Sequence, residues 1–227
     1  MHIYKYQKKG FQREKCNDAV LCTKNGERIF AGIADGAGNR DHALNGAMIA
    51  LDAAEKYMKD QNLAVFLDGY LDQRQFDILT AIRCALKITA CKEGCRMEEF
   101  ASTICALSCD TQTGDFILMN LGDGVVLGGK SGKDYCMISG AENHFTQNHT
   151  YLTTVDGAAS HIRLGKGNLD IFTSVILMTD GAWRMLRKNA RIKEILHLVS
   201  ERNYSKLDNE LSEMNFIDDA SIVVLSI

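Results

Sequence analysis

The apolar residues of this chain follow two patterns, short continuous runs and stripes of helical period. Continuous runs of this length favour buried strands, because a strand that is covered on both faces has no solvent-facing positions. Asn25 and Gly26 separate two of the runs, and this pair favours a tight hairpin turn. The strands that the runs predict lie at 19–24, 28–34, 103–109, 115–121, 124–128, 134–138, 174–179 and 220–226.

Apolar positions spaced three and four residues apart predict helices. The first helix has an apolar side made of Ala43, Ala47, Ala50, Ala54 and Tyr57. The second has a stripe made of Phe76, Leu79, Ile82, Ala85 and Leu86. The predicted helices lie at 41–59, 73–92, 182–200 and 205–213, and 139–172 holds only scattered strand-like pieces.

The predicted elements are rich in strands, with one pair of helices early in the chain and one pair late. This order lacks the regular alternation of strand and helix that is typical of a parallel doubly wound sheet. It favours an α+β sandwich of sheets with helices on the outside. No linker-like, repeated or low-complexity stretch interrupts the 227 residues. We therefore expect a single domain over 1–227.

The composition is that of an ordinary globular protein, with 46% apolar and 24% charged residues. A net charge of −3 offers no basic surface to nucleic acid or to anionic lipid, so we expect neither as a partner. Every apolar run is shorter than the ~18 residues of a membrane helix. The first residues lack the apolar core of a signal peptide, and a cytoplasmic location is expected.

Eight cysteines raise the question of disulfides or zinc, but no Cys-x-x-Cys pair occurs. Cys105 and Cys109 lie within an apolar run, and Cys84 and Cys91 lie within a predicted helix. In the absence of an export signal, we interpret the cysteines as reduced, small apolar residues. A zinc site that uses Cys91 and Cys95 is the alternative.

Four short apolar stretches end in an aspartate, and glycine follows three of these aspartates. A carboxylate at the end of a buried strand is held on rigid structure at the edge of the core. Four such carboxylates would repel one another if they converged without a cation. Hard divalent cations prefer oxygen ligands, and glycine lets its own carbonyl approach a ligand closely. The pattern suggests a shared cation site formed by Asp35, Asp123, Asp180 and Asp218.

These segments, taken in order, resemble the motifs of the metal-dependent type 2C protein serine/threonine phosphatases. The similarity runs from about residue 12 to residue 225, nearly the whole chain. An arginine stands five residues before an aspartate, as in the opening motif of that family. The segments that carry the resemblance are Arg13 to Ala19, Ala34-Asp35-Gly36-Ala37-Gly38, Ala101-Ser102-Thr103, Leu121-Gly122-Asp123-Gly124, Thr179-Asp180-Gly181-Ala182-Trp183 and Asp218-Asp219-Ala220-Ser221.

The resemblance implies a four-layer α/β/β/α sandwich in which two antiparallel β-sheets are flanked by paired helices. It also implies hydrolysis of phosphoserine and phosphothreonine in proteins with Mg²⁺ or Mn²⁺, without a covalent intermediate. Two metal ions about 3.5–4 Å apart can activate a water molecule for attack on phosphorus. The implied partners are phosphorylated proteins, with a serine/threonine kinase acting in the opposite direction.

By the same resemblance, Asp35 would bridge two metal ions, and Asp180 and Asp218 would complete the coordination shell of the first ion. The carbonyl of Gly36 would serve the second ion. Asp123 would hold, with Asp180, a possible third ion.

Two further residues acquire roles from the resemblance. Asp18 would orient metal-bound water. Arg13 would bind the substrate phosphate, because its planar guanidinium can donate two parallel hydrogen bonds to a pair of phosphate oxygens. The alternatives are that Asp18 and Asp123 are turn residues at strand ends and that Arg13 is a solvated surface residue. We expect Asp219 to support its loop, and Trp183 to pack in the core. His144, His149 and His161 are interpreted as surface or packing residues.

Three departures from the family pattern bear on the rate and selectivity of such an enzyme. Asn17 replaces a glutamate, which would weaken the second metal site. Ala37 stands where eukaryotic members have a histidine thought to protonate the leaving group, and such an acid is worth about 10²–10⁴ in rate. The short segment between Asp123 and Asp180 predicts a flap, within 124–179, that is reduced or absent.

The favoured hypothesis is therefore an active metal-dependent protein phosphatase. A catalytically weak domain of the same kind, which binds metal or phosphoprotein as a regulator, is the main alternative. An unrelated acidic cation-binding module is the third.

Overall fold

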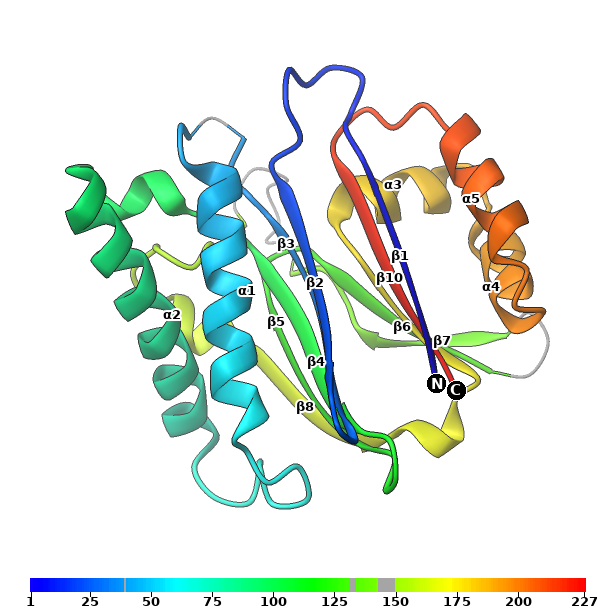
Figure 1. Cartoon of the computed structure of the whole chain (residues 1–227), viewed down its shortest axis with the longest axis horizontal. Helices are drawn as coiled ribbons and strands as arrows, with labels where there is room; N and C mark the ends of the chain where they lie inside the picture. Colours follow the sequence, from blue (N-terminus) through cyan, green and yellow to red (C-terminus); the bar gives the residue numbers. More distant parts are fainter. Residues whose placement is uncertain (39, 131–133, 143–149) are drawn as a thin grey trace.

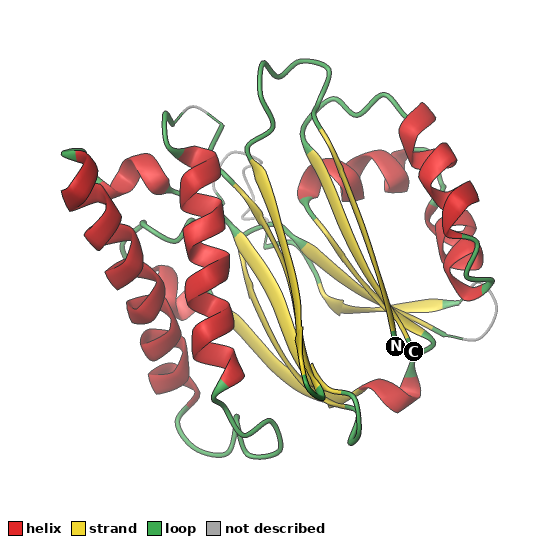
Figure 2. Ribbon diagram, in the orientation of Figure 1, coloured by secondary structure: helices red, strands yellow, loops and turns green. Residues whose placement is uncertain are grey.

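The computed structural model describes residues 1–38, 40–130, 134–142 and 150–227. Two five-stranded antiparallel sheets pack face to face, and helices cover the outer face of each sheet (Figures 1 and 2). The structure therefore confirms the predicted α+β sandwich with four layers. Among the described residues, no helix combines the length and the apolar character needed to cross a membrane.

The first sheet has the strand order β2-β3-β4-β5-β8. Its strands are β2 (Asp18–Asn25), β3 (Arg28–Asp35), β4 (Ile104–Asp110), β5 (Asp115–Leu121) and β8 (Arg163–Asn168). The helices α1 (Ala43–Lys59) and α2 (Leu71–Glu93) cover its outer face (Figure 1). A short 3₁₀ turn, η1 (Met97–Phe100), leads from α2 back to the sheet.

The second sheet has the strand order β1-β10-β9-β6-β7. Its strands are β1 (His2–Lys8), β6 (Val125–Gly129), β7 (Tyr135–Ser139), β9 (Ser174–Met178) and β10 (Ala220–Ser226). The helices on its outer side are α3 (Asp180–Lys188), α4 (Ile192–Ser200) and α5 (Tyr204–Glu213). Two further 3₁₀ turns, η2 (Ala158–His161) and η3 (Leu169–Ile171), flank β8.

Alternation along the strands divides the core into layers, because successive side chains of a strand point to opposite faces. In β3, Ile29 and Ile33 face the second sheet, whereas Phe30 and Ala34 pack beneath the helices. β3 can therefore be apolar along almost its whole length. The layer between the sheets is made of buried apolar side chains, and their packing fixes the positions of the strand ends.

Among the described residues, the sequence predicted eight of the ten strands to within two residues and missed the other two. β1 alternates apolar with polar residues at a sheet edge, and only Tyr6 of this strand is buried. β8 lies in the region that showed no clear pattern, and its sequence Arg-Leu-Gly-Lys-Gly-Asn contains a single apolar residue. Both are edge strands, which bury too few side chains to leave a strong local signal.

The single helix predicted at 182–200 is wrong, because the structure divides it into α3 and α4. Ala190 between them adopts a left-handed backbone with φ 55°, which interrupts the helical hydrogen bonds. The break lets α3 lie along β9 and β10 while α4 packs against α5. The predicted stripe of α2 is also displaced, since Phe76 is 59% exposed and Ile78 takes its place in the core.

Two further predictions concern packing and the flap. Trp183 packs against the apolar core beneath the second sheet but is only partly buried. The described part of 124–179 contains strands and 3₁₀ turns and no α-helix before α3. The reduced flap stays a prediction, because 143–149 lie outside the described residues, as do His144 and His149.

Candidate metal centre

The five aspartates to which the sequence assigned roles meet at one end of the sandwich. Asp18 begins β2 and pairs in register with Asp35, the last residue of β3. The other three lie beyond the end of β5, at the first position of α3, and just before β10. The charge of each of the other four acts on Asp35, which places them all around it: Asp18, Asp123, Asp180 and Asp218.

Backbone contacts hold the Asp35–Gly36 segment in place. The amide of Asp35 donates to the hydroxyl of Thr103 (3.0 Å), and the amide of Thr103 donates to the carbonyl of Asp35 (2.8 Å). The amide of Gly36 donates to the carbonyl of Asn17 at 3.1 Å. A Cβ at position 36 would lie 2.5 Å from the carbonyl oxygen of Ala43, so only glycine fits here.

The clustered carboxylates oppose one another's ionisation. Burial, reinforced by the charges of Asp18 and Asp180, raises the pKa of Asp35 well above its ordinary value. Burial likewise raises the pKa of Asp18 to about 7, against two hydroxyl hydrogen bonds that favour its ionised form. Burial and the charge of Asp123 raise the pKa of Asp180 to about 6. A bound cation would return these groups to the ionised form at neutral pH.

Several buried oxygens in this cluster have no hydrogen-bond partner among the described residues. They are the Oδ1 atoms of Asn17, Asp18 and Asp180. These atoms can only accept, so a cation or its water molecules would satisfy them. Carboxylate, amide and backbone carbonyl oxygens are the ligands that Mg²⁺ and similar hard ions take. The donor set therefore fits a hard divalent cation.

Arg13 binds one of the predicted metal ligands. Its Nε and Nη2 donate to Oδ1 and Oδ2 of Asp218 at 2.6 and 2.8 Å. Burial alone would raise the pKa of Asp218, but these two bonds and the amide of Asp219 outweigh it and lower that pKa. The loop beside Arg13 is close, since a Cβ at Gly38 would lie 2.4 Å from Nη1. Both oxygens of Asp218 are thus engaged by a guanidinium fork.

A second arginine, Arg184, which the sequence reasoning missed, lies beside Asp180 and Asp123. Nη2 of Arg184 is 3.0 Å from Oδ2 of Asp180 and 3.6 Å from Oδ2 of Asp123. The hydroxyl of Thr150 also donates to Oδ2 of Asp123 at 3.1 Å. The available signal was helical spacing, because Arg184 follows Asp180 by one turn. Its side chain is 61% exposed and offers a positive charge to this pair.

Asp219 supports the loops that carry the site. It is 4% exposed, and its two carboxylate oxygens accept from the amides of Gly10 (2.9 Å) and Asn17 (2.7 Å). These contacts join the segment before β10 to the segment that carries Arg13. His161 is half-buried and acts as a packing residue: its Nδ1 lies 2.7 Å from Oε1 of Glu142, and its ring stacks on that of Tyr151.

A small pocket of about 190 Å³ opens beside the cluster. Asp218 forms one wall, and the rest combines basic and apolar side chains from α3 and the segment before β10. The lining residues are Gly181, Arg184, Met185, Lys188, Ile217 and Asp218. The pocket can therefore take a side chain that lies next to a group bound at the aspartates.

Comparison with known proteins gives the fold a family. The sequence pattern of "Protein phosphatase 2C" matches residues 11–214. A bacterial serine phosphatase is 15% identical, with a TM-score of 0.71 over 100% of this chain and 98% of that one. The serine/threonine phosphatase of S. agalactiae is 14% identical, with a TM-score of 0.71 over 100% and 99%.

A further solved structure, RsbX in complex with magnesium, is 12% identical, with a TM-score of 0.57 over 98% of this chain and 92% of that one. A search of curated proteins found no significant match. At these identities the solved structures establish the shared fold, whereas the family pattern covers most of the sequence. The chain belongs to the protein phosphatase 2C family.

Proposed function

We propose that this protein is a metal-dependent phosphatase that hydrolyses phosphoserine and phosphothreonine in proteins and opposes a serine/threonine kinase. The observation that carries the proposal is the cluster formed by Asp18, Asp35 and Asp180, whose pKa values are all raised. In addition, the Oδ1 atoms of Asp18 and Asp180 have no hydrogen-bond partner in the part of the chain that the structure describes. Such an arrangement is unfavourable without a cation. Family membership, over residues 11–214, supplies the reaction class.

Asp35, Asp180 and Asp218 are proposed as the principal metal ligands, with the carbonyl of Gly36 as a further one. Asp123 is proposed to share a possible third ion with Asp180. Bound Mg²⁺ or Mn²⁺ would supply positive charge for the phosphate and Lewis acidity for a water molecule. The magnesium in the RsbX structure supports this choice of ion.

Arg13 is proposed to bind the substrate phosphate. Its paired bonds to Asp218 have the geometry that a guanidinium also makes with two phosphate oxygens. If Asp218 were to bind a metal ion instead, Arg13 would lose this partner and its guanidinium would be available to substrate. Metal binding and phosphate binding would then be coupled through Asp218.

Asp18 is proposed to orient water at the metal ions. Its Oδ2 accepts from the hydroxyl of Thr179 at 3.0 Å, so the direction of the carboxylate is fixed and Oδ1 remains available. Ala37 provides no acid for the leaving group, so we expect solvent to supply that proton and turnover to be slow.

The pocket beside Asp218 is proposed to receive the residue that neighbours the phosphorylated one. Arg184 and Lys188 favour an acidic neighbour, and Met185 and Ile217 favour an apolar stem. On this proposal, the selectivity of the enzyme rests on α3 and on the segment before β10.

A second candidate function is a catalytically weak regulatory domain. One observation favours it, namely that Arg13 engages both oxygens of Asp218, a required ligand. In this case, the protein would bind phosphoprotein or metal without turning substrate over.

The decisive experiment measures phosphate release from a phosphothreonine peptide with Mn²⁺ and again after addition of EDTA. We expect Mn²⁺-dependent release that Asp35→Asn and Asp180→Asn abolish. Asp52→Asn, which changes an exposed aspartate on α1, is the matched control and should retain activity. Release that is absent in the wild type under all metal conditions would favour the regulatory alternative.

A further inference from the structure

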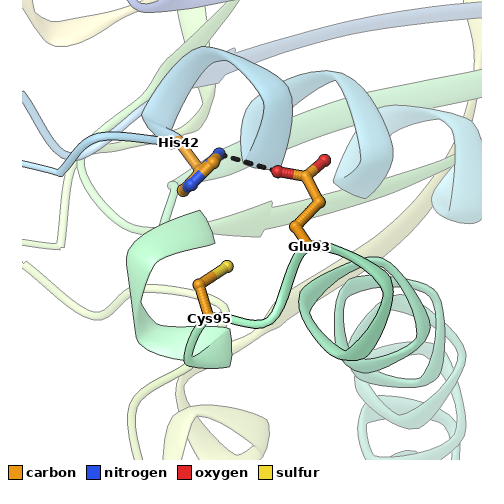
Figure 3. A group of neighbouring side chains, drawn as sticks. All are labelled: His42, Glu93 and Cys95. Carbon is orange, nitrogen blue, oxygen red and sulfur yellow. Dashed lines mark ion pairs between the residues drawn. The ribbon is translucent and has the colours of Figure 1, made fainter.

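Three side chains of different chemistry meet where the beginning of α1 lies beside the end of α2 (Figure 3). His42 is the residue before α1, Glu93 is the last residue of α2, and Cys95 follows two residues later. One ligand atom from each lies within 4.8 Å of the other two. Nδ1 of His42 is 3.1 Å from Oε2 of Glu93.

The chain turns at the end of α2, and this turn brings both Glu93 and Cys95 close to His42. Gly94 adopts a left-handed backbone with φ 67°, which is the ordinary way to end a helix. The amide of Cys95 then donates back to the carbonyl of Ala90 at 3.1 Å. This reversal brings the thiol beneath the carboxylate of Glu93, as Figure 3 shows.

Other contacts hold the imidazole and the carboxylate in place. The ring of His42 stacks on that of Phe100, with centroids 4.8 Å apart and planes inclined by 18°. Phe100 is completely buried, so it gives the imidazole a fixed support. The side-chain amide of Asn45 donates from Nδ2 to Oε1 of Glu93 at 3.4 Å, which leaves Oε2 directed at His42. Outer contacts of this kind orient the ligands in established metal sites.

We propose that His42, Glu93 and Cys95 form a binding site for Zn²⁺. Imidazole nitrogen, carboxylate oxygen and thiolate sulfur are the three ligand types that Zn²⁺ takes, and three protein ligands leave a fourth position for water. Hard Mg²⁺ has little affinity for nitrogen and sulfur, so this site is chemically distinct from the aspartate cluster.

The spacing is close to that of a bound site. Ligand atoms of a tetrahedral zinc ion lie roughly 3.3–3.8 Å apart, given bond lengths of about 2.0–2.3 Å. The separation of His42 from Glu93 is already near this value. The thiol of Cys95 has to move by no more than about 1 Å, which a change of side-chain torsion provides. Glu93 is exposed, so the ion has a path from solvent.

A zinc ion here would act on the loop that carries Asp35. His42 precedes Ala43, whose carbonyl packs directly against Gly36. The ion would fasten the beginning of α1 to the end of α2, and would thereby restrict the segment between Gly36 and α1. We therefore assign to it a structural and regulatory role for the neighbouring site rather than a part in catalysis.

The test uses Co²⁺ as a spectroscopic substitute for Zn²⁺, in the full chain with excess Mg²⁺ to occupy the aspartates. A cobalt–thiolate bond gives a charge-transfer band in the near ultraviolet that oxygen ligands cannot give. We expect the band at one equivalent of Co²⁺, and its loss in Cys95→Ala. Cys91→Ala, which removes an exposed thiol from the last turn of α2, is the matched control and should keep the band.

Substitution of the ligand His42 should weaken metal binding more than substitution of Asn45, which only holds Glu93 in place. We expect His42→Gln to weaken Co²⁺ binding by more than tenfold, and Asn45→Ala to weaken it by roughly tenfold. Zn²⁺ should displace Co²⁺, protect Cys95 from alkylation, and raise the melting temperature of the wild type but not of Cys95→Ala.

Three results would overturn the proposal. They are a band that persists in Cys95→Ala, a band that is lost in Cys91→Ala, or no band in the wild type at one equivalent. In each case the cluster would be an ion pair between His42 and Glu93 with an adjacent packing cysteine. Circular dichroism of each variant keeps loss of folding separate from loss of binding.

Discussion

Asp18→Asn tests whether like-charged carboxylates dominate the energetics of the metal-free site. The substitution keeps the size of the side chain and an oxygen that accepts from Thr179, but it removes one negative charge. Asp18 is 1% exposed, and its pKa rises from 3.8 to about 7 in the folded protein. Each unit of pKa difference corresponds to about 1.4 kcal/mol, so full ionisation of Asp18 destabilises the fold by about 4 kcal/mol.

The sign follows from proton linkage. Between pH 4 and 7 the folded protein holds a proton on Asp18 that the unfolded chain has released. The free energy of unfolding of the metal-free protein therefore falls as the pH rises through this window. Asp180, with a pKa raised to about 6, acts in the same direction. Asp18→Asn should flatten this slope and stabilise the metal-free protein at pH 7.5 by up to about 4 kcal/mol.

The assay is urea unfolding of the metal-free protein at a series of pH values from 4 to 8, for the wild type and for Asp18→Asn. Addition of Mg²⁺ or Mn²⁺ to the wild type should remove most of the loss between pH 4 and 7, because the cation neutralises the cluster. The exposed variant Asp52→Asn should leave the slope unchanged. A slope in Asp18→Asn equal to that of the wild type would refute the reasoning.

Three further substitutions test the remaining parts of the site. Arg13→Ala removes the proposed paired, charge-assisted contact with the substrate phosphate, which is worth about 1.5–3 kcal/mol. The value of kcat/KM should therefore fall about 10- to 100-fold, mainly through a higher KM. Unchanged kinetics would mean that Arg13 does not bind substrate. Arg184→Gln removes the cation beside Asp180 and should tighten Mn²⁺ binding in calorimetry, and weaker binding would contradict this. Gly36→Ala places a Cβ 2.5 Å from the carbonyl oxygen of Ala43, so thermal unfolding should show a loss of stability together with a loss of activity.

The sequence predicted most of the fold because its strongest signals are local. Buried strands need continuous apolar runs, and the strands at the centre of each sheet have them. The hairpin was readable for the same reason, although its turn lies one residue later than predicted. Asn25 still pairs with Arg28, so the turn residues are Gly26 and Glu27, and Gly26 has the positive φ of 59° that suits such a turn. The edge strands and the break at Ala190 depend on neighbouring elements, so no local pattern revealed them.

The sequence by itself also determined the acidic character of the candidate site, because an aspartate at the end of a buried run has only a small range of positions in a sandwich. Only the tertiary structure decided which side chains face one another. Asp218 and Arg13 are 205 residues apart, and their pairing follows from the way β1, β2 and β10 meet. Cys95 lies near His42 only because α1 and α2 pack antiparallel on one sheet. Periodicity records burial along one element, whereas contacts between elements arise from the packing of the whole chain.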